Sequence, residues 1–211
     1  MHPADCPTWE YRQHPHAGAV GIRCEAILNS LRNGKLPIDA TLRDTRPLHA
    51  DMFVNLTPAT CPYYAGRYRG EKPRCLRHHP VTIQSDPRVG AAPARVAPDL
   101  ANLNAHIIGV GLKTLDTAFA KSDSELPPEE KLNYLVIFAC RVMVEFFRIH
   151  PYVNGNGHVG RLIVWLLLAR FGYWPKKWPL DGTPSYSTLI KQYRDGDRLP
   201  LQKFVLESII G

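Results

Sequence analysis

The feature that most constrains this chain is a short glycine-containing loop, residues 150–161, between two apolar helical patterns. Before the loop, apolar residues recur at three- and four-residue steps over 132–147, which is the spacing of one buried helix face. Pro151 ends this helix because proline lacks the N–H that another turn would need. After the loop, residues 162–171 are almost wholly apolar and lead to Gly172, a common helix terminator. The sequence therefore predicts a helix–loop–helix turn with two mostly buried helices.

The loop carries groups that suit a bound phosphate. Gly155 and Gly157 let the backbone bend and let a ligand approach closely. We expect the second helix to begin at about Asn156, so that its unpartnered first N–H groups and the helix dipole favour an anion. Arg161, one turn into that helix, offers a planar fork of donors to the same phosphate. His150 suits general-base work because its ordinary pKa is near neutrality.

Each of these features also has an ordinary structural interpretation. A Gly-Asn-Gly sequence is most often a turn, a histidine before a proline is often a helix end, and an arginine one turn into a helix is usually solvated. Their combination at this spacing, between two buried helices, is harder to explain in that way. A base beside a phosphate cradle predicts phosphoryl or nucleotidyl transfer to a hydroxyl group.

The residues His-Pro-Tyr-Val-Asn-Gly-Asn-Gly-His-Val-Gly-Arg at 150–161 resemble the signature of Fic-domain proteins. That signature runs His-Pro-Phe, two variable positions, Gly-Asn-Gly-Arg, two variable positions, Arg. The resemblance implies transfer of AMP, or a related nucleotide part, from ATP or another nucleoside triphosphate to a Ser, Thr or Tyr hydroxyl of a target protein. His150 would take the hydroxyl proton. The backbone of Gly155, Asn156 and Gly157 would hold the phosphates, and Arg161 would meet the terminal phosphate.

Two positions depart from the family pattern. The residue that is usually an Asp or Glu and binds the metal is Asn154 here. Its amide oxygen carries no charge, so we expect a weak site for Mg²⁺ or Mn²⁺, which prefer carboxylates. The first arginine of the signature is His158 here, which is mostly neutral at pH 7 and shorter. Two alternatives to an adenylyltransferase stay open: a non-catalytic module that binds a nucleotide or a partner, and a Fic enzyme with a different phosphoanhydride donor.

A second resemblance to the family lies upstream, at Gly-Arg-Tyr-Arg over 66–69. It looks like the segment that leads into a β-hairpin flap, and the β-branched run Val81, Thr82 and Ile83 would be the second flap strand. In the family, the flap edge pairs with the backbone of the target. The residues around the expected hairpin form a basic patch, which suits either a solvated loop or an acidic partner: Arg67, Arg69, Lys72, Arg74 and Arg77.

Five cysteines, at positions 6, 24, 61, 75 and 140, show no framework spacing. We expect reduced thiols rather than disulfides. A zinc site is an alternative, since thiolate and imidazole ligands suit zinc, and its ligands would be Cys61, Cys75, His78 and His79. Cys61 lies far from the other three along the chain and no mirrored ligand pair exists. Free cysteines and surface histidines are therefore the expectation, and zinc is not.

We expect residues 1–40 to be an N-terminal extension and residues 41–211 to be the Fic domain. The extension contains a helix-like segment over 19–31. Many Fic proteins carry an inhibitory helix with Ser or Thr, three variable residues and a Glu that pairs with the second arginine of the signature. Glu25 matches this glutamate, although the hydroxyl residue is missing. It is a candidate inhibitor of Arg161, or simply an exposed helix carboxylate.

The net charge of +7 fits a polyphosphate ligand or an acidic partner. No helix-turn-helix or RNA-binding signature is present, so we do not expect a nucleic-acid partner. Residues 1–17 lack the apolar core of a signal peptide, and the longest apolar run, 162–169, is too short for a bilayer. We expect a cytoplasmic protein without a membrane partner; a secreted effector is an alternative. An antitoxin or another regulator is a further candidate partner.

The remaining segments complete an all-α prediction. Helical patterns cover 46–56, 99–119, 184–194 and 199–210, and the Ala-, Pro- and Arg-rich residues 90–98 are expected to be a linker. The fold class is therefore a helical bundle of the Fic type in which the β-hairpin flap is the one small β element.

Overall fold

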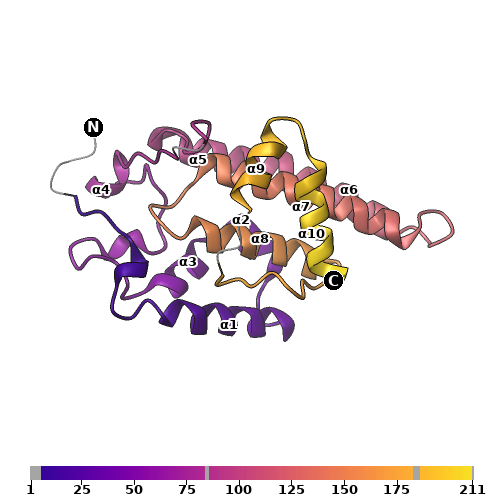
Figure 1. The fold of residues 1–211 in the computed structure, drawn as a ribbon, viewed down its shortest axis with the longest axis horizontal. Coiled ribbons are helices and arrows are strands. Elements are labelled where there is room, and N and C mark those ends of the chain that lie inside the picture. The colour runs from indigo at the N-terminus through magenta and orange to yellow at the C-terminus, as the bar shows by residue number, and fades with distance from the viewer. Residues whose placement is uncertain (1–5, 84–85, 183–185, 211) are drawn as a thin grey trace.

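The structure is a computed structural model that describes residues 6–83, 86–182 and 186–210. These residues form ten α-helices, and they contain no strand (Figure 1). The helices are α1 Ala19–Arg32, α2 Ile38–Arg43, α3 Arg46–Phe53, α4 Arg74–Arg77, α5 Pro93–Asn102, α6 Gly109–Phe119, α7 Pro128–Ile149, α8 Asn156–Arg170, α9 Ser187–Arg194 and α10 Leu199–Ile210. Two 3₁₀-helical turns, η1 Tyr11–Gln13 and η2 Pro62–Tyr64, and one π-helical segment, η3 Leu103–Ile108, complete the order. The all-α prediction is confirmed.

The antiparallel helices α7 and α8 form the centre of the bundle (Figure 1). α7 begins at Pro128, where the missing N–H of proline has no intrahelical partner to lose, and two glutamates follow in its first turn. α8 is buried almost all round. The two helices approach closely because Gly160 has no side chain, and a Cβ there would overlap the ring of Phe147. This close packing fixes where α7 ends relative to where α8 begins.

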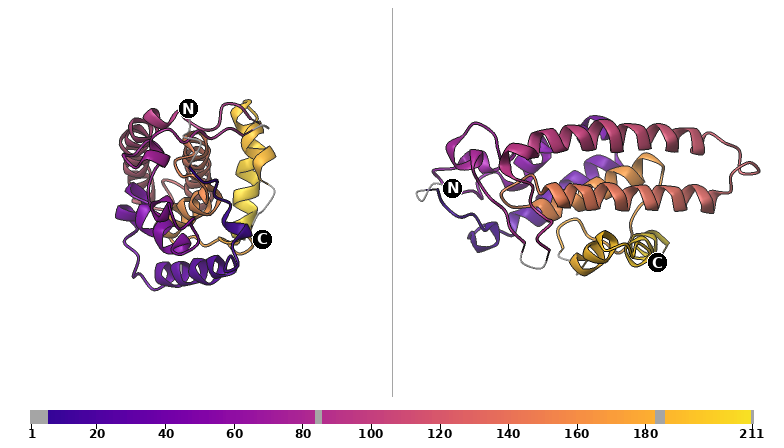
Figure 2. Two further views of the ribbon diagram at one scale, coloured as in Figure 1. Left: turned by 90° about the vertical axis from the view of Figure 1, so that its left-hand side faces the viewer. Right: turned by 90° about the horizontal axis from the view of Figure 1, so that it is seen from above.

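One long helical stretch, α5–η3–α6, runs alongside α7 in the opposite direction (Figure 2, right). The expected linker at 90–98 was wrong, because α5 already begins at Pro93. Proline is favourable at this first position, and the buried Val96 and Leu100 hold the turn against the core. The helix also tolerates Pro98 in its interior, at the loss of one backbone hydrogen bond.

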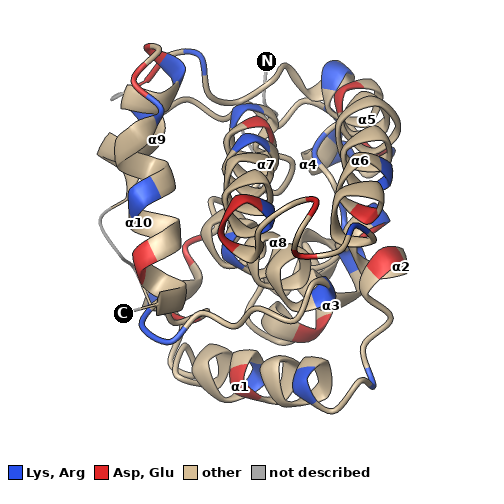
Figure 3. Ribbon diagram, turned by 90° about the vertical axis from the view of Figure 1, so that its right-hand side faces the viewer, with Lys and Arg blue, Asp and Glu red and all other residues tan. Residues whose placement is uncertain are grey.

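The other helices surround this centre (Figure 3). α1 packs against α3 and α8, α2 packs against α8, and α9 and α10 pack against α7 on the opposite side from α5 and α6. Buried side chains of α1, among them Val20, Cys24 and Ile27, belong to the same hydrophobic core as those of α7 and α8. Among the described residues, no helix combines the length and the apolar character that crossing a membrane requires.

The predicted β-hairpin flap is not supported, since residues 81–83 are irregular and no strand occurs in the described ranges. Two features explain the difference. Pro80 and Pro87 bracket the run and cannot donate ladder hydrogen bonds. The expected partner segment is used elsewhere, because the N–H of Arg69 donates to the carbonyl of Pro151 over 2.8 Å. Gln84 and Ser85, between the run and Asp86, lie outside the described residues.

The expectation of reduced thiols was wrong for two of the five cysteines. Cys6 and Cys75 form a disulfide between the N-terminal segment and α4, with their Cα atoms 5.5 Å apart. The other three, Cys24, Cys61 and Cys140, are free and buried. Sequence spacing could not pair Cys6 with Cys75, because 69 positions separate them and only the folded chain brings them together.

Candidate active site

The loop between α7 and α8 is held in one shape by its own side chains. His150, directly after the end of α7, adopts the left-handed conformation (φ 52°), uncommon for a residue other than glycine. Gly155, just before α8, is also left-handed (φ 77°), and a Cβ there would overlap the ring of Phe53. The buried Asn156 side chain accepts from the N–H of Tyr152 and donates to its carbonyl, each over 2.9 Å. Asn156 therefore shapes the loop with its side chain.

His49 of α3 supports the loop by a hydrogen bond to its backbone. No pattern in the sequence indicated this residue. Its Nδ1 accepts from the N–H of Gly66 over 2.9 Å, so Nε2 carries the proton and donates to the carbonyl of Asn154 over 3.0 Å. The ring is fully buried, and burial lowers the pKa of His49 to about 3. One histidine among the apolar residues of a helix gave no signal that distinguished this role.

Arg69 is the second supporting residue, and its assignment to an exposed basic patch was wrong. Its side chain is 1% exposed and donates to four carbonyls: His150 (2.8 Å), Ile149 (2.9 Å), Ala91 (3.0 Å) and His79 (3.1 Å). Burial lowers the pKa of Arg69 to about 10, so it stays charged at neutral pH. It ties the end of α7 to the segments on either side of residues 81–89. The Gly-x-aromatic-Arg pattern was the signal that marked it.

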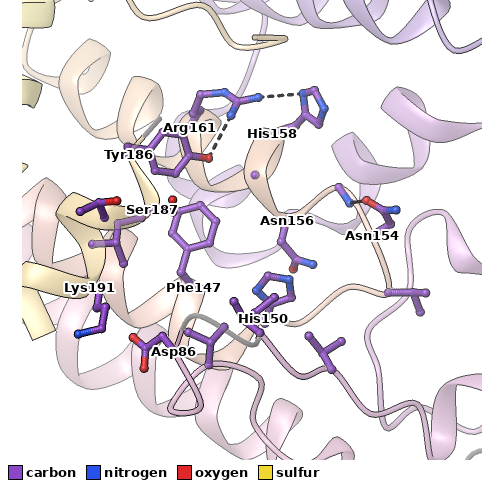
Figure 4. A pocket seen from close by; sticks show the side chains of 18 of the residues that line it. Asp86, Phe147, His150, Asn154, Asn156, His158, Arg161, Tyr186, Ser187 and Lys191 are labelled. Atoms are coloured by element: carbon purple, nitrogen blue, oxygen red, sulfur yellow. Dashed lines mark hydrogen bonds between the residues drawn. The ribbon is translucent and has the colours of Figure 1, made fainter. Parts of the chain in front are cut away.

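The first turn of α8 presents hydrogen-bond donors, and the side chain of Arg161 lies in the same cavity (Figure 4). The N–H groups of Asn156 and Gly157 meet no acceptor within the described parts of the chain. Arg161 is 2% exposed, and its guanidinium donates to the carbonyl of Leu180 (2.8 Å) and the hydroxyl of Tyr186 (3.1 Å). A guanidinium has five N–H groups, so Arg161 keeps donors for a ligand.

His158 lies beside Arg161 and is also buried. Its Nδ1 is 3.2 Å from a guanidinium nitrogen of Arg161, and its Nε2 is 2.6 Å from the hydroxyl of Tyr11. Burial, and next the charge of Arg161, lower the pKa of His158 to about 4. This side chain is therefore neutral at pH 7 and adds no positive charge to the site.

His150 faces the same space with an unsatisfied ring. Its Nδ1 is buried and has no hydrogen-bond partner among the described residues. Burial lowers the pKa of His150 to about 4, and the positive charges of Arg69 and Arg194 act in the same direction. The imidazole is neutral at pH 7 and can accept a proton. A polyanion bound beside it would offset the two arginine charges and raise its pKa, which strengthens it as a base.

These groups line one cavity of about 540 Å³, a size that suits a nucleotide. It brings together most of the predicted site residues: His150, Asn154, Gly155, Asn156, Gly157, His158, Arg161, Val81 and Ile83. Thr82 is exposed between the last two. Apolar residues also line it, among them Val89, Phe147 and Ile190, and α9 adds Ser187, Thr188, Lys191 and Arg194. The sequence analysis missed α9 and the N-terminal residues Tyr11 and Arg12, because no local pattern links them to the loop.

Comparison with known proteins agrees with this geometry. The model of the Fic/DOC family matches residues 39–168. The chain belongs to the Fic/DOC family. Over 72 residues, 34% of its length, it is 33% identical to the protein adenylyltransferase Fic of Drosophila virilis and of Drosophila melanogaster. The matched stretch spans 15% of the length of each of these two relatives.

The Fic/DOC signature implies a divalent metal at the position that Asn154 occupies, and the side chain present does not fit one. Its amide oxygen accepts the N–H of Gly155 over 2.6 Å, and its amide nitrogen donates to the carbonyl of Trp9 over 2.9 Å. Both polar atoms of Asn154 are thus committed to the chain itself. These contacts give Asn154 a structural role, and a weak magnesium ligand at this position stays a prediction.

The nearest substitute is no better suited to a metal. Asp86 is the carboxylate among the described residues that line the cavity, and it is bound by the guanidinium groups of Arg88 (2.7 Å) and Arg194 (2.9 Å). These contacts hold the pKa of Asp86 well below its usual range, with its charge already balanced. Nowhere in the described ranges do three or more His, Cys, Asp or Glu side chains form a metal-binding group.

Two further predicted groups lie apart from the site. Glu25 is exposed on α1, and the structure gives it no ion pair with Arg161. Of the four residues weighed as zinc ligands, Cys75 is engaged in the disulfide and Cys61 is a buried free thiol whose Sγ lies 3.3 Å from the hydroxyl of Tyr63. His78 is exposed beside α4.

Proposed function

We propose that this Fic/DOC-family chain is a protein adenylyltransferase that moves AMP from ATP to a Ser, Thr or Tyr hydroxyl of a target protein. The observation that carries the proposal is the convergence on one nucleotide-sized cavity of a neutral His150, the free N–H groups at the start of α8, and Arg161. The named relatives, which are adenylyltransferases, support the same activity.

In the proposed reaction His150 accepts the proton of the target hydroxyl as its oxygen attacks the α-phosphorus of ATP. The new bond joins that oxygen to phosphorus, the bond between the α- and β-phosphates breaks, and pyrophosphate leaves with the displaced electron pair. The proton on His150 then passes to solvent or to the leaving group. Because the imidazole is neutral at pH 7, it is ready to accept at the start of each turnover.

Charge that develops on the phosphates would meet fixed donors. The N–H groups of Asn156 and Gly157 and the guanidinium of Arg161 need no reorganisation to stabilise it, which is the usual source of electrostatic catalysis. The target would lie along residues 81–83, where Val81 and Ile83 line the cavity and Thr82 points outward. The exposed Thr82 makes this segment accessible to a target.

The test is transfer of label from ATP carrying ³²P at the α-phosphate to protein in a lysate, with wild type beside His150→Ala. We expect labelled protein only with the wild type, and equal ATP affinity for both proteins by calorimetry. His106→Ala is the matched control, because His106 is exposed on η3 and does not line the cavity. Equal labelling by wild type and His150→Ala would overturn the assignment of the base.

Because Asn154 and Asp86 are poor metal ligands here, the same experiment also tests two other functions. ATP binding without any label would point to a non-catalytic nucleotide-binding module. Failure with ATP but labelling from another nucleotide would point to a different phosphoanhydride donor. Including manganese in one arm prevents a missing metal from being mistaken for missing activity.

A further inference from the structure

The N-terminal segment, residues 6–13, is fastened across the loop between α7 and α8. The Cys6–Cys75 disulfide holds its start, and the Tyr64 hydroxyl donates to the carbonyl of Pro7 over 3.1 Å. The indole of Trp9 donates to the carbonyl of Leu56 over 2.7 Å, while the carbonyl of Trp9 accepts from Asn154, as described above. These attachments set the positions of Tyr11 and Arg12, the first two residues of η1.

The first of these, Tyr11, connects the segment to the phosphate cradle. It is buried, and its hydroxyl lies 2.6 Å from Nε2 of His158. The next residue, Arg12, lines the cavity with an exposed side chain, and its Nε donates to the Tyr11 hydroxyl over 3.3 Å. The charge of Arg12 is also among the causes that lower the pKa of His158, which agrees with their closeness.

Arg12 differs from two other cations of the cavity in having no counter-ion within residues 6–83, 86–182 and 186–210. Lys191 pairs with Asp195 over 2.6 Å and Arg194 pairs with Asp86, so their charges are already balanced. Neither Arg12 nor Arg161 forms an ion pair with any carboxylate of the described residues. Two guanidinium groups, one buried and one exposed, therefore line the same cavity without a carboxylate partner in the described part of the chain.

We propose that Arg12 is a ligand-binding residue that neutralises the phosphate chain of the bound nucleotide, supplying from the N-terminal segment the positive charge that His158 does not provide. The proposal rests on the proposed function, because it assigns a phosphate contact for the same nucleotide. Arg12 is suited to this contact by its exposed, planar fork of donors and by the attachment of its segment to the loop.

The experiment compares ATP binding by wild type, Arg12→Ala and Arg12→Lys in calorimetry, with adenosine as a second ligand. We expect Arg12→Ala to weaken ATP binding about tenfold to a hundredfold, as the loss of a charged hydrogen bond does, and Arg12→Lys to recover part of it. Adenosine, which has no phosphate, should bind all of the variants alike. Lys35→Ala is the matched control, since it removes one exposed positive charge that does not line the cavity.

The outcomes separate this proposal from the proposed function. If the wild type binds ATP and Arg12→Ala binds it equally tightly, the role of Arg12 alone is overturned. A wild type that binds no nucleoside triphosphate would overturn both. An equal loss of adenosine affinity in Arg12→Ala would also count against the proposal, because it would show a general disturbance of the cavity. Thermal unfolding of each variant checks that the exposed substitution leaves the fold intact.

Discussion

The imidazole ring of His49 lies flat against the phenol ring of Tyr152, with ring centroids 3.8 Å apart and 2° between the planes. The hydroxyl of Tyr152 shares a 2.6 Å hydrogen bond with Thr45, just before α3. A buried, neutral histidine of α3 therefore holds both the side chain and the backbone of the loop between α7 and α8. His49 thus supports the loop that follows His150, although it lies outside the signature.

This arrangement predicts that stability falls in mild acid. The folded protein lowers the pKa of His49 to about 3 and those of His150 and His158 to about 4, against an ordinary value near 6.5. Between these values the unfolded chain binds protons that the folded chain does not, so the stability these groups contribute is present above about pH 6.5 and is lost as pH falls toward 4. Thermal unfolding measured from pH 8 to pH 4 should show a Tm that declines below about pH 6.5.

His49→Gln tests which group is responsible. The variant should lose about 1–3 kcal/mol of unfolding free energy at pH 7, because one of the two buried backbone partners of the ring is left unsatisfied. The slope of its stability against pH in mild acid should also report about one proton fewer taken up on unfolding than in wild type. His106→Gln, an exposed change on η3, should alter neither quantity. An unchanged proton count in His49→Gln would refute the assignment of a buried neutral histidine.

Gly160→Ala should destabilise the protein, against the usual preference of helices for alanine. A Cβ at Gly160 would overlap the ring of Phe147 at the contact between α7 and α8, and overpacking of this kind costs about 1–3 kcal/mol. Urea unfolding measures the loss. Gly18→Ala is the control, because no atom lies within 4 Å of a Cβ at that position. If Gly160→Ala were as stable as wild type, the two helices could not be as close as described.

Sequence alone could predict the centre of this fold because its information is local. The apolar period of α7, Pro151 and the Gly-Asn-Gly run specify a helix, a stop and a second helix within forty or so residues. The same short stretch carries His150 and Arg161, so the family and the principal site followed from it. A pattern of this kind needs no knowledge of what lies elsewhere in the chain.

The rest of the site depends on contacts across long sequence separations, which no local pattern encodes. The sequence placed Arg69 in a basic patch with four other cations, yet its side chain is buried among four carbonyls. The structural role of Asn154 could not be predicted, because its partner, the carbonyl of Trp9, lies 145 positions away in the sequence. The run 81–83 has β-branched residues but no partner strand among the described residues, since the segment expected to pair with it binds Pro151 through the N–H of Arg69 instead.

The disulfide predicts a dependence of stability on oxidation. Cys6 and Cys75 close a loop of about 70 residues, for which chain entropy gives up to about 4 kcal/mol of stabilisation. Cys75→Ser should therefore unfold at a lower urea concentration than oxidised wild type. Its affinity for ATP should fall as well, since the segment that carries Arg12 loses one attachment. Reductant should lower the urea midpoint of the wild type to that of Cys75→Ser and leave the midpoint of the variant unchanged. A wild-type midpoint that does not respond to reductant would contradict the prediction.

Binding of ATP should not require a divalent metal. Both polar atoms of Asn154 are hydrogen-bonded to the chain, and Asp86 is balanced by two arginines. Arg12 and Arg161, which have no carboxylate partner among the described residues, already line the cavity. Magnesium also neutralises part of the charge on ATP, which weakens its attraction to Arg12 and Arg161. Calorimetry should therefore give an affinity in chelator that equals or exceeds the affinity in magnesium.

Asn154→Asp is the matched variant for this prediction. The carboxylate can still accept the N–H of Gly155, but it cannot donate to the carbonyl of Trp9 and instead repels it. We expect a loss of about 1–3 kcal/mol in unfolding free energy, together with a magnesium dependence of ATP binding that wild type lacks. A wild type that binds ATP more tightly in magnesium than in chelator would show that a metal site forms despite these contacts, because neutralising the phosphates by itself weakens their attraction to Arg12 and Arg161.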